Sequence, residues 1–261
     1  MQFNPLSIND HTIRPYLRLP APHQRIIIAA PRLHDAPQIY ELLNDPRIYR
    51  WITGPPFPYL MEHAVSWLTQ AKADADAIWN ELEQANAESR DRPLKTVGGC
   101  PVRSVLEEND DGSYTYLGDC GFVRHTFDDV TDVEERTRLL QENNARPAGD
   151  PSTIWSMGGK CAQTRLTMAN AKVISDYLRP SHHGKGIMTA IVGTLLNAWG
   201  IPRMNIRCVR ALVLEGNPGS VRVFEKNGFV LRKTVVDCIR MVTKGEHPGR
   251  LHTLHLLELR R

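Results

Sequence analysis

The segment Val173–Trp199 constrains the fold most, because it joins a strand to a helix through a glycine turn. Val173–Leu178 is strand-like and stops before Pro180, whose missing N–H cannot serve a β-ladder. From Gly186 onward, apolar residues recur every three or four positions, which predicts a helix. The start of such a helix presents unpaired N–H groups and the positive end of its dipole. The segment therefore predicts a possible anion site at the turn.

The turn itself reads SHHGKG, from Ser181 to Gly186. Gly184 and Gly186 allow the backbone to approach an anion without an intervening Cβ, and Lys185 adds positive charge. A plain connection, in which the glycines only relieve strain, fits the turn equally well. Neither the GxxxxGK[ST] pattern nor the GxGxxG pattern is matched. The turn alone leaves both interpretations open.

A second motif lies downstream in the segment Gly216–Phe229, which reads GNPGSVRVFEKNGF. It predicts a short helix with clear ends: Asn217 suits the N-cap, Pro218 the first helical position and Gly228 the C-terminal stop. The apolar segment Met204–Leu214 before it predicts a strand. This half of the chain is therefore ordered as strand, glycine turn, helix, strand and short helix.

The turn and the second motif together resemble the GNAT superfamily of N-acetyltransferases, in its branch of ribosomal-protein-alanine acetyltransferases. In that family a loop of the form Arg/Gln-x-x-Gly-x-Gly/Ala binds the pyrophosphate of coenzyme A, and here Ser181 replaces the first residue. The family's later motif, Asn-x-x-Ser…Glu-Lys-x-Gly-Phe, is matched by Asn217, Ser220, Glu225, Lys226, Gly228 and Phe229. The resemblance covers about residues 25–236 and is specific for the superfamily and its cofactor, not for a substrate.

The resemblance implies an α/β (α+β) fold with a twisted, mixed central sheet. The sheet is expected to be splayed at the cofactor cleft and covered by helices on both faces. We expect a single domain over residues 25–261, an irregular N-terminal arm over residues 1–24, and a surface insertion at about residues 126–172.

The resemblance also implies acetyl-CoA as the cosubstrate, a primary amine as the acceptor and no metal. Backbone amides from His182 to Ile187 would hold the pyrophosphate, and the strand edge at Tyr177–Leu178 would pair with the pantetheine arm. The candidate cofactor-binding residues are Tyr177, Leu178, His182, His183, Gly184, Lys185, Gly186, Ile187, Asn217, Ser220 and Phe224.

Acetyl transfer requires a neutral amine, a polarised thioester carbonyl and a proton for the leaving thiolate. Many relatives supply that proton from a tyrosine, but Phe224 stands at its position, so the resemblance assigns the role to Ser220. The glutamate that this branch carries after its Gly-Phe pair is absent, and Asp176 is our candidate for accepting the amine proton. A hydrogen bond in the first helical turn would explain Ser220 equally, and a solvent-facing carboxylate would explain Asp176.

Two other functions fit the same residues. One is a coenzyme A-binding protein that has lost catalysis, which Phe224 and the missing glutamate suggest. The other is a nucleotide- or anion-binding α/β module without acyl chemistry. The acceptor also stays open among a protein N-terminus, a lysine, a polyamine and a small xenobiotic amine. Trp51 and Trp67 are candidates for the walls of an acceptor cleft.

Composition argues against several other classes of function. A formal net charge of +3 over 261 residues, with no block rich in Lys and Arg, argues against a nucleic-acid partner. Residues 1–22 are polar and broken by prolines, and no apolar run reaches membrane-spanning length, so we expect no membrane partner. Five scattered cysteines without a C-x-x-C pair indicate reduced thiols and no zinc site. We expect a cytoplasmic protein, with a nuclear location and the oligomeric state left open.

Periodicity predicts further strands and helices along the chain. Strands are expected at residues 25–30, 96–105, 114–123, 229–236 and 251–259, and helices at residues 62–89 and 131–144. Asp35 is placed to cap a helix that follows it, and prolines break residues 46–58 into loop and turn. The spacing from Thr131 to Glu134 is that of a capping box on a surface helix.

One segment does not fit the family pattern. Gly158–Lys172 falls inside what the family writes as one continuous strand, of which residues 152–158 and 173–178 each look like a part. A translated intron explains the segment, because Gly-Lys-Cys can be encoded by a splice-donor-like sequence and Leu-Thr by a branch-point-like sequence. A genuine surface loop explains it too, and the sequence of the native transcript separates the two.

Overall fold

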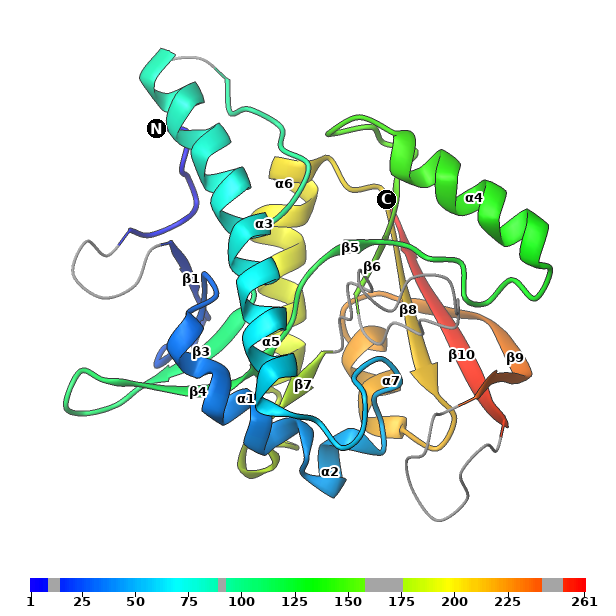
Figure 1. Ribbon diagram of the computed structural model, residues 1–261. Coiled ribbons are helices and arrows are strands. Elements are labelled where there is room, and N and C mark those ends of the chain that lie inside the picture. The colour runs from blue at the N-terminus through cyan, green and yellow to red at the C-terminus, as the bar shows by residue number, and fades with distance from the viewer. Residues whose placement is uncertain (9–14, 89–92, 158–175, 241–250) are drawn as a thin grey trace.

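The computed structural model describes residues 1–8, 15–88, 93–157, 176–240 and 251–261 (Figure 1). Its strands form two five-stranded sheets. The first sheet has the order β1 (Tyr16–Arg18), β2 (Ile26–Ala29), β3 (Ser104–Glu108), β4 (Tyr114–Asp119) and β7 (Tyr177–Leu178). The second sheet has the order β5 (Val123–Arg124), β6 (Ile154–Ser156), β8 (Cys208–Leu214), β10 (Leu251–Arg260) and β9 (Val230–Arg240).

Most neighbouring strands pair antiparallel, and β6 and β8 pair parallel. The helices are α1 (Ala36–Leu43), α2 (Pro46–Tyr49), α3 (Met61–Glu88), α4 (Val133–Ala145), α5 (Ile187–Thr194), α6 (Ile201–Met204) and α7 (Pro218–Glu225). A π-helical segment, Leu195–Gly200, joins α5 to α6. Short 3₁₀ turns precede α1 at Leu33–Asp35 and α5 at Pro180–His182. The predicted mixed α/β architecture is confirmed.

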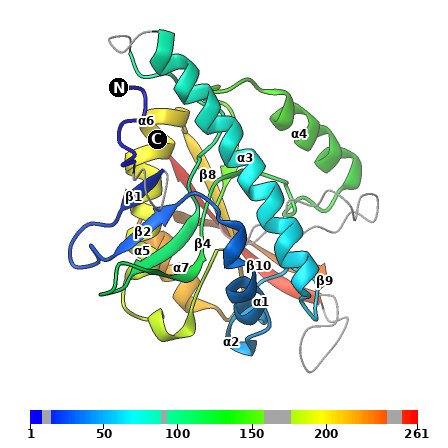
Figure 2. The same ribbon diagram turned by 60° about the vertical axis from the view of Figure 1, so that its left-hand side comes forward.

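Alternating side chains of β2 show how helices cover both faces of the first sheet. Ile26 and Ile28 enter the larger core, where α5 and the π-helical segment pack. Ile27 and Ala29 point to the opposite face and enter a smaller core with α1. Figure 2 shows α3 crossing the front of the molecule, with α1 and α2 beside its N-terminal end. The period of two along β2 therefore separates two helical layers.

The two sheets meet where one strand path changes partners. β4 pairs with β7, whereas β5, four residues further along the chain from the end of β4, pairs with β6. On this path only residues 120–122 lie between the two ladders. On the opposing path the twenty residues 157–176 lie between them. β4 and β5 follow one another closely in the chain, but their partners β7 and β6 belong to different sheets.

The segment Gly158–Lys172 lies outside the described residues, so both explanations of its origin stand as before. The boundaries of the predicted domain and of the insertion at about residues 126–172 likewise remain predictions. Within that range, the structure places α4 and β6.

Several predicted elements are confirmed at close to their expected bounds. The strand at residues 25–30 is β2, the long helix is α3, and the helix after Gly186 is α5. α7 begins and ends as the second motif predicts, with Gly228 at a φ of 85° just beyond it. In these elements the apolar period and the capping residues agree, which is why the sequence located them well.

Other predicted elements differ from the structure. The N-terminal arm is not wholly irregular, because it supplies β1, which pairs with β2. Residues 46–58 contain a one-turn helix, α2, since Asp45 caps it by accepting a hydrogen bond from the Arg47 amide. Only Ser104 and Val105 of the predicted strand at residues 96–105 belong to β3.

Two carboxylates have roles other than those predicted. Asp35 makes no cap with its side chain; it is buried and accepts two hydrogen bonds from the Arg32 guanidinium, at 2.9 and 2.7 Å. The cap of α4 is Asp132, which accepts from the Glu135 amide at 2.8 Å, and not Thr131. In both places an ionised carboxylate accepts the hydrogen bonds, and such bonds are stronger than those between neutral groups.

A buried carboxylate in the second sheet binds three arginines. Glu258 on β10 lies 2.9 Å from Arg210, 2.7 Å from Arg260 and 3.4 Å from Arg232. Burial by itself would raise the pKa of Glu258, but hydrogen bonds from Arg260 and Arg210 outweigh it and lower that pKa to about 2. The charged form is therefore the one that stabilises this sheet.

Glu258 is expected to make the protein sensitive to acid. Its stabilising contribution is present above its unfolded-state pKa, which is about 4.3, and is lost as the pH falls toward about 2. Urea unfolding at pH 5 and pH 3 measures the loss. The variant Glu258→Gln should be less stable at pH 5 and should show a smaller drop between these two values; an equal drop would contradict the assignment.

The contact between β4 and β7 should tolerate no side chain at Gly118. A Cβ added there would lie 2.0 Å from the Tyr177 carbonyl oxygen. We expect Gly118→Ala to lower the free energy of unfolding by about 1–3 kcal/mol, measured by urea denaturation, because backbone must move. Gly98→Ala is the matched control, since its Cβ would meet Ala148 at an ordinary 3.4 Å. Equal losses in the two variants would show that the close approach is unimportant.

Candidate active site

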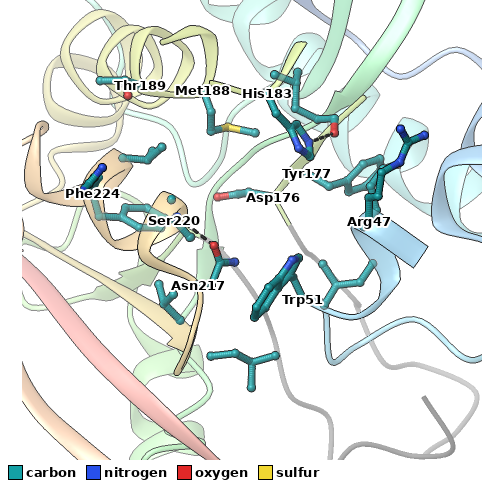
Figure 3. Close-up of a pocket in the computed structure, with 18 of the residues that line it drawn as sticks. Arg47, Trp51, Asp176, Tyr177, His183, Met188, Thr189, Asn217, Ser220 and Phe224 are labelled. Carbon is teal, nitrogen blue, oxygen red and sulfur yellow. Dashed lines mark hydrogen bonds between the residues drawn. The ribbon is translucent and has the colours of Figure 1, made fainter. Parts of the chain in front are cut away.

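A cleft of about 640 Å³ opens beside β7 and the end of β8 (Figure 3). Its lining comes from residues 47–53 of α2 and the following loop, residues 176–189 around the glycine turn, and residues 212–226 from β8 to α7, with Leu254 of β10. The fold thus brings the turn and the second motif, which lie about 30 residues apart in the sequence, onto one cavity.

Eleven of the twelve predicted site residues line this cleft: Asp176, Tyr177, Leu178, His182, His183, Gly184, Gly186, Ile187, Asn217, Ser220 and Phe224. Lys185 does not line it, although it lies between two lining glycines. Trp51 lines the cleft, whereas Trp67 does not; Trp67 stacks instead against the Arg103 guanidinium, 4.6 Å away. Trp67 is therefore not a wall of this cleft.

The glycine turn presents a series of free backbone donors. Gly184 and Gly186 have φ values of 74° and 79°, which favour glycine, and an added Cβ at Gly184 would meet no atom within 4 Å. The first backbone hydrogen bond of α5 runs from the Ala190 amide to the Gly186 carbonyl. Within the described residues, the amides from Gly184 to Thr189 donate no hydrogen bond. These amides form the start of a helix open to an anion.

Two amides of the predicted set from His182 to Ile187 already donate hydrogen bonds within the protein. The His182 amide donates to Arg179 at 2.8 Å and the His183 amide donates to Pro180 at 3.2 Å, because both belong to the 3₁₀ turn. Pro180 is the one residue whose type favours such a turn here.

Both histidine rings are tied into the turn. The His183 Nε2 lies 2.6 Å from the Leu178 carbonyl oxygen. The His182 Nε2 lies 3.2 Å from Glu107, and its Nδ1 lies 3.0 Å from the Ser181 hydroxyl. The rings therefore brace the turn against β7 and β3.

The edge of β7 contributes backbone groups to the cleft. The Arg179 amide donates to Leu117 of β4, so by alternation the polar groups of Leu178 point to the opposite edge. The Tyr177 side chain is buried in the smaller core, and its hydroxyl lies 3.0 Å from that of Tyr116. Burial raises the pKa of Tyr177 well above its usual value, so this phenol stays protonated.

The start of α7 places Asn217 and Ser220 at the cleft. The Asn217 Oδ1 accepts a hydrogen bond from the Ser220 amide at 3.1 Å, which confirms Asn217 as the cap. Within the described residues, the Ser220 hydroxyl makes no hydrogen bond, so a side-chain bond in the first turn is not what holds it there. Phe224 is buried against Phe229, with ring centroids 5.1 Å apart, and forms an apolar wall.

Asp176 points into the cleft, toward the space between Met188 and Asn217 (Figure 3). Both of its carboxylate oxygens are buried, so the interpretation as a solvent-facing carboxylate is wrong. Cys120 lies close behind it: burial raises the pKa of this thiol, and the negative charge of Asp176 raises it further. The carboxylate is thus held at the base of the cleft, out of bulk water.

Sequence reasoning missed the cations of the cleft. Arg47 of α2 and Arg50 directly after this helix line the cleft, as do Arg222 of α7 and Lys226 directly after that helix. The sequence offers little signal for them, because the prolines of residues 46–58 predict loop and turn and single arginines are common on surfaces.

The described residues contain no group of three His, Cys, Asp or Glu side chains that is arranged to hold a metal ion. In the same part of the chain, no helix combines the length and the apolar character needed to cross a bilayer.

The family model for the acetyltransferase (GNAT) domain matches residues 25–230. Because this match covers most of the chain, the protein belongs to the GNAT acetyltransferase family, and its class of enzyme is that of the N-acetyltransferases. The resemblance found in the two motifs is confirmed. Comparison with curated protein sequences gave no match.

Solved structures share the fold at low sequence identity. The acetyltransferase (GNAT family) from Bacillus anthracis is 12% identical, with 94% of this chain and 98% of that chain covered and a TM-score of 0.56. The ribosomal-protein-S5-alanine acetyltransferase from Vibrio fischeri is 14% identical, with 94% and 96% covered and a TM-score of 0.53. The microcin C7 self immunity acetyltransferase MccE, in complex with acetyl-CoA and AMP, is 14% identical, with 91% and 93% covered and a TM-score of 0.53.

Proposed function

We propose that this enzyme binds acetyl-CoA in the cleft and transfers the acetyl group directly to a primary amine, either a protein N-terminus or a small amine. The observation that carries the proposal is the run of free amides from Gly184 to Thr189 at the start of α5, on the same cleft as Asp176 and Ser220. The similar fold of MccE, a structure in complex with acetyl-CoA, supports it.

The residues present fit the cosubstrate. The open amides and the glycine turn suit the pyrophosphate, since nothing lies within 4 Å of a Cβ built on Gly184. Lys226, directly after α7, lies near the start of α5, because the neighbouring Asn227 donates to the Thr189 carbonyl of α5 at 3.1 Å. The pantetheine arm would pair with the polar groups of Leu178, whose carbonyl has a second lone pair beside the one that faces His183.

The chemistry requires three events at the acetyl end. The amine loses a proton, its nitrogen bonds to the acetyl carbon, and the carbon–sulfur bond breaks. We assign the amine proton to Asp176, which is buried and points into the cleft. We assign protonation of the thiolate to Ser220, whose hydroxyl recovers its proton from water, since Phe224 has none to give. Holding both reactants in one cleft supplies much of the rate.

Coenzyme A should stabilise the folded protein. Binding to the native state alone raises the free energy of unfolding by about 2.7 kcal/mol at a hundredfold excess over Kd, so the melting temperature should rise. Gly186→Val should remain folded and lose most of that rise. Valine disfavours the φ of 79° that Gly186 adopts, so the neighbouring amides should no longer be held in place. Thermal unfolding with and without coenzyme A measures both.

ATP serves as the control ligand in this experiment. A rise with ATP and none with coenzyme A would identify an anion- or nucleotide-binding module instead of an acetyltransferase. A full rise in Gly186→Val would mean that the turn is only a connector.

Ser220 and Asp176 should affect turnover more than binding. Ser220→Ala is expected to lower kcat on the order of a hundredfold with little change in the coenzyme A-induced rise, because the lost interaction grows in the transition state. Asp176→Asn should also lower kcat, and activity should recover in part at higher pH as more of the amine becomes neutral. Thiol release from acetyl-CoA over an amine panel measures both.

Two results would revise these roles. An unchanged kcat in Ser220→Ala, measured where the variant is fully folded, leaves water or positioning to complete the reaction. Coenzyme A binding without thiol release for any amine in the native protein identifies a coenzyme A-binding protein that has lost catalysis.

A further inference from the structure

The side chains that line the cleft carry more positive than negative charge. Among its described lining residues, the carboxylate of Asp176 is accompanied by the cations of Arg47, Arg50, Arg222 and Lys226. Such a lining repels a polycation such as a polyamine and attracts negative charge. Coenzyme A is itself anionic, so only those cations that lie away from its phosphates can bind the acceptor.

Three of the four cations already have a partner or a place near the phosphates. Arg47 is paired with Asp45, whose two carboxylate oxygens accept from its guanidinium at 2.6 to 3.2 Å. Arg222 lies on α7 and Lys226 directly follows it, and the Asn227 side chain after them donates a hydrogen bond to α5. They are therefore placed on the side of the free amides.

Arg50 is different because it lies beside Trp51. Its guanidinium carbon is 5.2 Å from the centre of the Trp51 ring, and in the described part of the chain it forms no ion pair. Trp51 packs against Leu214 and Leu254, and its ring lies 3.9 Å from a Cβ built on Gly216, directly before Asn217. Trp51 and Asn217 thus line the part of the cleft that Asp176 faces (Figure 3). Arg50 also lines the cleft and flanks this part because it lies beside Trp51.

We infer that the acceptor carries an anionic group close to its amine and that Arg50 binds this group. The inference rests on the proposed transfer to an amine. A cation near the acceptor also lowers the pKa of the amine, which favours the neutral nucleophile. The anionic group is either the α-carboxylate of an amino acid or an acidic side chain near the N-terminus of a peptide.

Peptides that differ only in charge test the inference. Ala-Asp-Glu, Ala-Asn-Gln and Ala-Lys-Lys, each followed by the same neutral tail, are compared by kcat/KM at low salt. We expect the acidic peptide to exceed the basic one by about tenfold or more, and the difference to shrink as salt is added. Alanine against alaninamide tests the α-carboxylate, so the more strongly discriminated pair identifies the source.

Variants link the preference to Arg50. Arg50→Gln should bring the ratio of kcat/KM for the acidic over the neutral acceptor close to one, and Arg50→Lys should restore part of the preference. Arg47→Gln is the matched control and should keep the ratio, because Asp45 already neutralises Arg47.

The outcomes are separable from those of the proposed function. Equal turnover of all acceptors, a preference for Ala-Lys-Lys, or an unchanged ratio in Arg50→Gln would overturn the inference while transfer itself stands. Loss of the melting-temperature rise with coenzyme A would overturn the proposed function first. No acetylation of any acceptor, despite that rise, would overturn both the transfer and the inference.

Discussion

The cleft depends on the close approach of β7 to Gly118. At this contact β4 pairs with β7 in the first sheet. β5, the next strand along the chain from β4, pairs with β6 in the second sheet. The consecutive strands β4 and β5 therefore pair with two strands, β7 and β6, that lie in different sheets. Because no strand of the described residues pairs with the polar edge of Leu178, the fold offers a place where an extended ligand can pair with backbone.

Buried charge supports this junction from behind. Arg103 binds Asp119 at the end of β4 with two groups of its guanidinium and stacks on Trp67. The positive charge of Arg103 opposes the rise in the pKa of Cys120 that burial causes. The negative charge of Asp176 in turn raises the pKa of Arg103. An ion pair of this kind fixes the end of β4 just below the carboxylate that faces the cleft, so the base of the site is positioned by strand pairing and charge together.

The glycine turn and the boundaries of α7 could be predicted from the sequence, because in both places local capping chemistry and apolar period agree with the fold. The one-turn helix α2 and the exposed Arg50 directly after it could not be predicted, since a four-residue helix has no period to detect and their role depends on packing beside a distant strand. The hydrogen bonds of the His182 and His183 amides could not be predicted for a similar reason, because they belong to the 3₁₀ turn before Gly184. Local pattern located the site, and tertiary contacts decided which atoms face it.

Tyr177 belongs to two parts of the molecule at once. Its ring packs in the smaller core with Ile39 of α1 and Ile48 of α2, while its backbone forms the margin of the cleft. A change of volume in that core would move α2 and the margin of β7 together. The packing of a core on one face of the sheet thus sets the width of a cleft on the other side of the same strand.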